Sequence, residues 1–201
     1  MDRELNHAPA AKSHCPPDTN LVDRLRYWSA TRPDQVAFYS WNGGDDEKRL
    51  TYRELDRQSR EIAVRLRRLG AVQKPVLLLY PQSLEFVSAF FGCLYAGAIA
   101  VPAFPPRRNR NIERIQSISE DAGADVVLTV RDVIGRSQDS LEETPQLRQL
   151  NWLSTDDFDS SLADEWRMPE LDAAALARTK EKRYVNPLEQ ESLVNIVEGR
   201  P

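Results

Sequence analysis

Three short apolar runs constrain the fold of this chain more than any other feature of its sequence. They are Pro75–Tyr80, Ala98–Val101 and Asp125–Val130. Each run is too short for a buried helix, and its apolar residues do not alternate with polar ones, which is typical of a strand buried on both faces. Stretches of helical length separate the runs. Strands that alternate with helices in this way predict an α/β domain with a mostly parallel, helix-covered sheet.

The helix expected after residue 51 has the clearest boundary signals. Thr51 can cap it, Glu54 stands where a capping box needs a glutamate, and Gly70 is suited to end it. Further helices are expected from Leu21 until Pro33 interrupts the pattern, from Ser83 to Ala96, and from Asn111 to Ala122 with Gly123 as the stop.

A β-hairpin is expected near the amino terminus. Val36–Trp41 is rich in β-branched and aromatic residues, and "NGGDDE" follows it as a turn. The returning strand is short and ends in "RLTY". A weaker strand, "NWLST", is expected after Gln149.

The stretch from Phe90 to Arg110, which carries no charge before Arg107, first raises the possibility of a membrane span. A span needs about 20 apolar residues in one helix. Here Gly97 and Pro102 interrupt the helix, and Glu85 opens it. The sequence therefore favours a buried helix followed by a buried strand, and no membrane span.

The same stretch resembles a phosphate-binding loop only in its glycine spacing. Gly92 and Gly97 match that spacing, but Ala98 and Ile99 stand where a P-loop has Lys and Ser or Thr. Arg107, Arg108, Arg110 and Arg114 offer a second way to hold an anion, near a helix start. A solvated helix start is the favoured interpretation of these arginines.

Metal binding is not expected from the histidines and cysteines. His7, His14 and Cys15 lie in a Pro- and Ala-rich leader at a spacing that matches no zinc pattern. Cys15 and Cys93 are too few for a disulfide framework, and the first twenty residues hold no apolar run of the kind a signal peptide needs. A cytoplasmic location is therefore expected.

The overall charge also limits the partners. Lys and Arg number 27 against 31 Asp and Glu, so the net charge is −4. This near balance argues against nucleic acid or an anionic membrane as the default partner.

Three segments resemble the amino-terminal part of the adenylate-forming enzymes. They are "LTYREL" (Leu50–Leu55), the run from Val76 to Pro106, and "RIQSISEDAGADVVLT" (Arg114–Thr129). Within that superfamily they look most like the fatty acyl-AMP ligases, including the loading domains that precede some polyketide and peptide synthetases. The resemblance covers roughly Asn20 to Thr155. Relatives often carry glycine where this chain has Ser83, and a serine there is expected to cap the helix.

The resemblance implies a reaction for the intact enzyme. A fatty acid attacks the α-phosphorus of ATP in the presence of Mg²⁺, and the acyl group then passes to an acyl carrier protein. The family's phosphate loop, Thr-Ser-Gly-Ser-Thr-Gly followed by Pro-Lys-Gly, is expected soon after residue 170, and the chain contains no such string. We therefore expect a truncated fragment that is inactive alone, with no catalytic, cofactor-binding or metal-binding residue and no bound cofactor.

The expected organisation is a disordered leader over 1–20, a partial AMP-dependent ligase domain over 21–170, and a divergent tail over 171–201. A short helix is expected in the tail, capped by Asn186, with Pro187 at its first position, Glu189 completing a capping box and Gly199 ending it. Self-association is expected, because a partial domain leaves apolar faces exposed.

Two other functions stay open. The chain could be a non-catalytic module that pairs with a full-length ligase or a carrier protein through its tail helix. An unrelated nucleotide- or flavin-binding protein would need a glycine-rich loop, which neither "YPQSLEF" nor "AFPPRRNR" supplies.

Overall fold

The computed structural model describes residues 20–41, 47–106, 112–142, 144–157 and 161–169. Four predicted features therefore lie outside the described residues, apart from single residues at their edges. They are the disordered leader, the hairpin turn, the tail helix, and the cluster of Arg107, Arg108 and Arg110.

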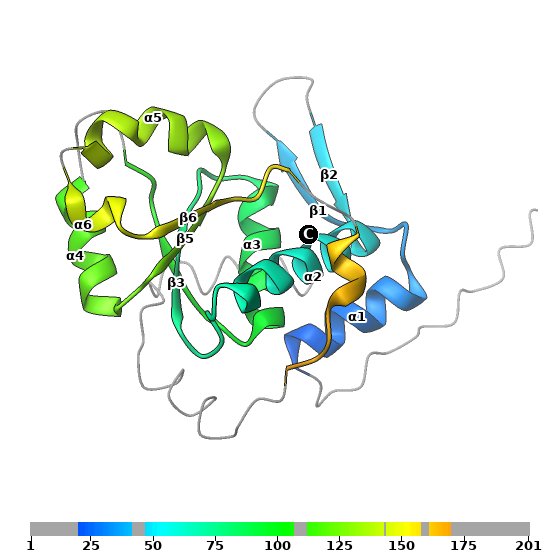
Figure 1. Cartoon of the computed structure of the whole chain (residues 1–201). Helices are drawn as coiled ribbons and strands as arrows, with labels where there is room; N and C mark the ends of the chain where they lie inside the picture. The colour runs from blue at the N-terminus through cyan, green and yellow to red at the C-terminus, as the bar shows by residue number, and fades with distance from the viewer. Residues whose placement is uncertain (1–19, 42–46, 107–111, 143, 158–160, 170–201) are drawn as a thin grey trace, which may run out of the picture.

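A four-stranded sheet forms the centre of the fold (Figure 1). Its strands are β3 (Pro75–Leu79), β4 (Ile99–Ala103), β5 (Val126–Thr129) and β6 (Asn151–Ser154), in the order β4-β3-β5-β6. Every neighbouring pair is parallel. The predicted α/β class and the parallel sheet are confirmed.

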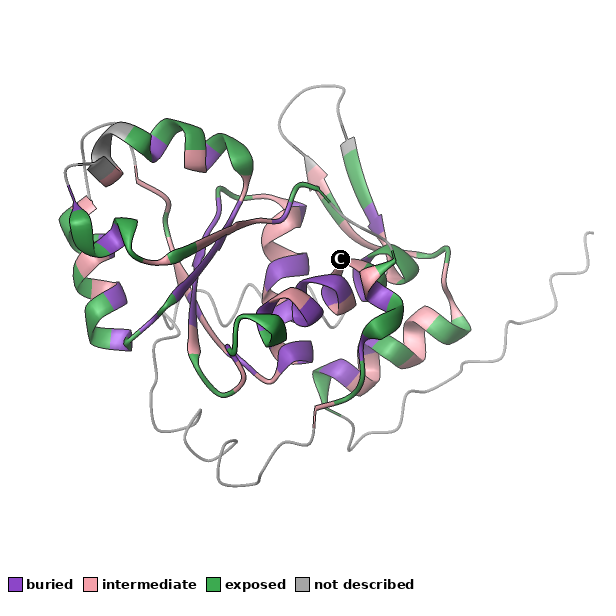
Figure 2. Ribbon diagram, viewed as in Figure 1, coloured by how far each residue is buried: buried purple, intermediate pink, exposed green. Residues whose placement is uncertain are grey.

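Helices cover both faces of this sheet. Alternate residues of β3 point to opposite sides, as they must in a strand. Val76 and Leu78 join the core that contains α2 (Tyr52–Arg68) and α3 (Leu84–Ala96), whereas Leu77 and Leu79 join the core that contains α4 (Ile112–Ala122). Figure 2 shows β3 and β5 buried along most of their length, which explains their uninterrupted apolar sequence.

The smaller amino-terminal elements match their predicted positions. Helix α1 spans Leu21–Thr31, and β1 (Val36–Trp41) pairs with β2 (Glu47–Thr51) in an antiparallel hairpin whose register shifts between Val36 and Phe38.

The capping box at α2 is present as predicted. The Thr51 hydroxyl accepts from the Glu54 amide at 3.3 Å, and the Thr51 amide donates to the Glu54 carboxylate at 2.9 Å. The Thr51 hydroxyl also donates to the Glu54 carboxylate at 2.7 Å. The two bonds that the carboxylate accepts, first the one from the backbone amide and then the one from the hydroxyl, lower the pKa of Glu54. The three predicted helix stops, Gly70, Gly97 and Gly123, all have positive φ.

One predicted cap is wrong. Ser83 stands at the N-cap position of α3 in extended backbone geometry, but its side chain makes no capping hydrogen bond. Its Oγ atom is buried and has no hydrogen-bond partner among the described atoms. The residue type favours capping, but here the hydroxyl does not reach the first-turn amides of α3.

Three short elements of the carboxyl-terminal half were not predicted. They are α5 (Arg131–Glu142), α6 (Pro145–Arg148) and the 3₁₀ helix η1 (Leu162–Glu165). Beyond β6, η1 packs on α2. We call residues 155–157 and 161–169 the return segment. None of the described helices is long and apolar enough to cross a membrane.

Candidate functional site

The carboxyl ends of the parallel strands are the first place to look for a site, because open α/β sheets bind ligands there. Three hydroxyl groups meet at this edge. The Tyr80 hydroxyl lies 2.9 Å from Thr155 Oγ1, which donates to the Thr129 carbonyl at 3.2 Å. The Thr129 hydroxyl donates to the Leu79 carbonyl.

These hydroxyl groups hold the strand ends together and leave no donor for a ligand. Each of the three side chains is buried, and each hydroxyl proton already has an acceptor within the cluster. Burial also raises the pKa of Tyr80 well above its usual value, so its proton is not available near neutral pH. The cluster is a cross-link between β3, β5 and β6.

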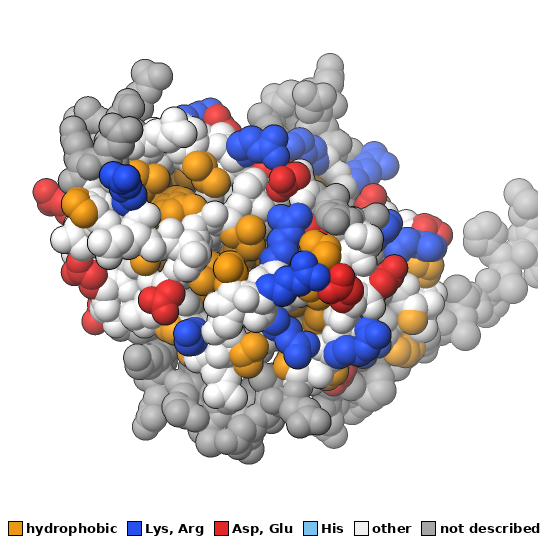
Figure 3. All heavy atoms as spheres, viewed as in Figure 1, with side chains coloured by type: hydrophobic (Ala, Val, Ile, Leu, Met, Phe, Trp, Pro, Cys, Tyr) orange, Lys and Arg blue, Asp and Glu red, His pale blue; other side chains and the backbone are white. Residues whose placement is uncertain are grey.

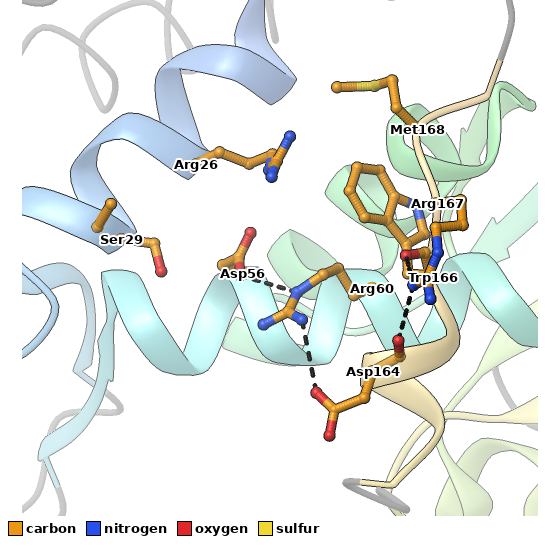
Figure 4. A pocket seen from close by; sticks show the side chains of 9 residues that line it. Arg26, Ser29, Asp56, Arg60, Asp164, Trp166, Arg167 and Met168 are labelled. Carbon is orange, nitrogen blue, oxygen red and sulfur yellow. Dashed lines mark hydrogen bonds and ion pairs between the residues drawn. The ribbon is translucent and has the colours of Figure 1, made fainter.

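The second candidate site is a cleft beside α2 (Figure 4). Its volume is about 530 Å³. Helix α1, helix α2 and the return segment form its walls, and no strand contributes. The lining residues are Arg26, Ser29, Ala30, Asp56, Arg60, Asp164, Trp166, Arg167 and Met168.

A buried network forms the floor of this cleft. One carboxylate oxygen of Asp56 accepts from the Tyr95 hydroxyl at 2.8 Å, and the other accepts from Arg60 Nε at 2.9 Å. The Trp166 indole donates to the Tyr95 carbonyl at 2.9 Å, with the two rings 5.0 Å apart. The network therefore joins α2, α3 and the return segment.

Four arginines along α2, which we call the arginine row, bind the return segment. They are Arg60, Arg65, Arg67 and Arg68. Arg60, Arg65 and Arg67 donate to backbone carbonyls of Ala163, Asp157 and Arg167, at 3.2, 2.6 and 2.9 Å. Arg68 pairs with the Glu165 carboxylate at 2.6 Å. The row holds the return segment on the helix, together with the buried side chains of Ala163 and Trp166.

Burial raises the pKa of Tyr95 far above its usual value, and the neighbouring Asp56 charge raises it further. A phenol that keeps its proton in the folded state but loses it near pH 10 when unfolded makes stability fall as the pH rises above about 10. Above pH 10, we expect the free energy of unfolding of the Tyr95→Phe variant to fall less steeply with pH than that of the wild type. The expected difference between the two slopes is about 1.4 kcal/mol per pH unit.

Urea unfolding between pH 9 and pH 11.5 would measure this difference. Tyr39→Phe is the matched control, because the Tyr39 ring lies largely in water in the folded protein. Curves of stability against pH with equal slopes for the wild type and Tyr95→Phe would contradict the assignment.

The residues singled out in the sequence do not meet at either place. Arg114 lies exposed on α4, and the rest of its cluster falls outside the described residues, as do His7, His14 and Cys15. Cys93 is fully buried in α3, and burial raises the pKa of its thiol. Within the described ranges no group of three His, Cys, Asp or Glu side chains could hold a metal ion.

The residues of the cleft floor were missed by sequence reasoning. The four-residue spacing of Asp56 and Arg60 on one helix was a visible signal for their ion pair. Nothing local in the sequence links that pair to Tyr95 or Trp166.

Comparison with known proteins places the chain in a family. The model of the AMP-binding enzyme family matches residues 25–197. The medium-chain-fatty-acid–[acyl-carrier-protein] ligase JamA of Moorena producens is 36% identical over 167 residues, which cover 81% of this chain and 28% of the relative. The long-chain-fatty-acid–AMP ligase FadD32 of Mycobacterium marinum is 26% identical over 163 residues, 79% of this chain and 26% of the relative.

Solved structures agree with the sequence match. The fatty acyl-adenylate ligase from L. pneumophila, in complex with acyl adenylate and pyrophosphate, superposes with a TM-score of 0.67 at 28% identity. The match covers 76% of this chain and 26% of that one. The chain therefore spans about a quarter of the length of the relatives it matches. It belongs to the AMP-binding enzyme family, and its relatives there include fatty acid–AMP ligases and a fatty acid–acyl-carrier-protein ligase.

Proposed function

We propose that these 201 residues are a structural part of a fatty acyl-AMP ligase and do not activate fatty acids by themselves. In the proposed reaction of the whole protein, a fatty acid carboxylate attacks the α-phosphorus of ATP and pyrophosphate leaves. A carrier protein thiol then attacks the acyl carbonyl, and AMP leaves. The names of the relatives support the substrate class.

Two observations together support the proposal: the chain matches the family, but its sequence does not contain the family's phosphate-loop strings. The 201 residues contain no Thr-Ser-Gly-Ser-Thr-Gly or Pro-Lys-Gly string. At the carboxyl edge of the sheet the described hydroxyl groups are already used by the protein. Because phosphate transfer depends on donors and cations placed around the phosphates, the described residues do not fit ATP and Mg²⁺.

An ATP–pyrophosphate exchange assay with medium- and long-chain fatty acids tests the proposal. The purified 201-residue chain is expected to show no exchange above the protein-free background. A fatty acyl-AMP ligase of full family length is the positive control under the same conditions. Exchange by the chain alone, proportional to its concentration, would refute the proposed inactivity.

The partners belong to the same proposal. One relative is named as a ligase for an acyl carrier protein, and a nonribosomal peptide synthetase structure matches with a TM-score of 0.53. A carrier protein or a synthetase module is therefore the proposed partner class. Self-association is proposed because the chain spans about a quarter of its relatives' length, and a partial domain leaves apolar faces exposed. The proposed location is the cytoplasm, in keeping with the two cysteines of the sequence.

A further inference from the structure

Three arginines that lie together have no carboxylate partner within the described residues: Arg26, Arg67 and Arg167. The Arg26 guanidinium lies over the Trp166 ring, with Cζ 5.2 Å from the centroid. Arg67 donates only to the Arg167 carbonyl, and Arg167 donates to the Asp164 and Trp166 carbonyls. Hydrogen bonds to carbonyls leave the positive charges uncompensated. Figure 3 shows basic side chains gathered on this face, with acidic ones among them.

The acidic residues of the cleft do not cancel this charge. Asp56 is buried and already binds Arg60 and Tyr95. The Asp164 carboxylate is 87% exposed and lies 3.9 Å from Arg60, so this ion pair is weak. The residues that line the cleft include three arginines and two aspartates, so the cleft carries one net positive charge, although the chain as a whole carries a net charge of −4.

The cleft also offers a small apolar surface beside these cations, namely Met168, which is 44% exposed. Trp166 is only 7% exposed; its indole donates to the Tyr95 carbonyl, and it forms the wall on which the Arg26 guanidinium rests. In Figure 4 Arg26, Trp166 and Met168 face the same opening from α1 and from the return segment. A volume of about 530 Å³ is large enough to receive side chains rather than a single ion.

From this geometry we propose that the cleft is a docking site for an acidic segment of a partner protein. Its carboxylates pair with Arg26 and Arg167, whose planar guanidinium groups suit two-point binding of carboxylates, and a neighbouring apolar side chain rests on Met168. The site goes beyond the proposed function, because no step of acid activation uses these residues. The two proposals can fail independently, since docking is measured without ATP.

A direct binding measurement on the full 201-residue chain tests the docking site. The probe is an acetylated, amidated hexapeptide of alternating Glu and Leu, and its analogue with Gln in place of Glu is the neutral control. NMR titration follows the arginine Nε–H and tryptophan indole signals of the ¹⁵N-labelled chain. The acidic peptide is expected to bind, and more weakly as the salt concentration rises, because exposed charges are screened.

Charge-removing variants locate the binding. Arg26→Gln and Arg167→Gln are each expected to weaken binding about tenfold, which corresponds to about 1.4 kcal/mol for a charge-assisted contact. Arg114→Gln removes the same charge from the exposed face of α4 and is expected to leave binding unchanged. Circular dichroism confirms that each variant is folded.

Four results would overturn the docking site. They are no binding of the acidic peptide up to 10 mM (about the weakest contact of interest on the affinity scale), equal binding of the Gln peptide, equal binding by Arg26→Gln, and inorganic phosphate binding as tightly as the peptide with the same arginine dependence. The last result would identify a site for small anions in place of a protein partner.

Discussion

Gly92→Ala is expected to lower the free energy of unfolding by about 3 kcal/mol, at the upper end of the cost of overpacking. A Cβ atom at this position would lie 2.5 Å from Ile62 Cγ2 and 2.7 Å from Ile62 Cβ. No rotamer change moves the Ile62 Cβ atom, because it is attached directly to the backbone of α2. The close contact of α2 and α3 at this point must therefore open. Urea unfolding followed by circular dichroism measures the loss.

Gly135→Ala is the matched control for this substitution. Gly135 also lies within a helix, α5, but a Cβ atom there would meet no atom within 4 Å. The variant is expected to gain up to about 1 kcal/mol from helix propensity. A Gly92→Ala variant as stable as the wild type would show that α2 and α3 are not packed this closely.

A double-mutant cycle with Ile62→Ala isolates the steric contact. Ile62→Ala removes Cγ2 but keeps Cβ, so it is expected to relieve the clash only in part. The two substitutions together should cost less than the sum of their separate costs, because they share one contact.

Asp56→Ala is expected to cost about 3 kcal/mol, since removing one member of a buried ion pair leaves its partner uncompensated. The estimate is at the low end of the range for buried pairs because the Arg60 side chain is 27% exposed. The Tyr95 hydroxyl, which is fully buried, also loses its acceptor. Thermal and urea unfolding would both register the loss.

Asp34→Ala is the matched control, because it removes an exposed carboxylate and not a buried one. Asp34 pairs with Arg53 at 3.1 Å, but both side chains are mostly exposed. Its removal is expected to change stability by less than about 1 kcal/mol. Similar losses for the Asp34 and Asp56 variants would show that the cleft floor has no special role in stability.

The parts of the fold that could be predicted are those with local signals. The apolar runs predicted β3 and β5, and Thr51 with Glu54 predicted the start of α2. Helix α5 was missed because its sequence, "RDVIGRSQDSLE", is mostly polar and contains a glycine. The identity of Ser83 predicted a cap, but residue type alone does not fix the direction of a hydroxyl.

The cleft could not be predicted from the sequence because its parts come from distant segments. Tyr95 is 39 residues from Asp56, and Trp166 is 71 residues from Tyr95. Periodicity reports which face of a helix is buried, but it does not report what packs against that face. The arginine row binds the backbone of the return segment, and Ala163 and Trp166 are buried, but neither contact has a periodic signal in the sequence.

The arginine row has a consequence for how this region can change over generations. Three of its four members recognise peptide carbonyls, which every amino acid provides. The exposed side chains of the return segment can therefore be exchanged while the segment keeps its path, provided that the arginines of α2 and the buried Ala163 and Trp166 are retained. Selection for this contact falls on the helix, and the loop it holds is left free to diversify.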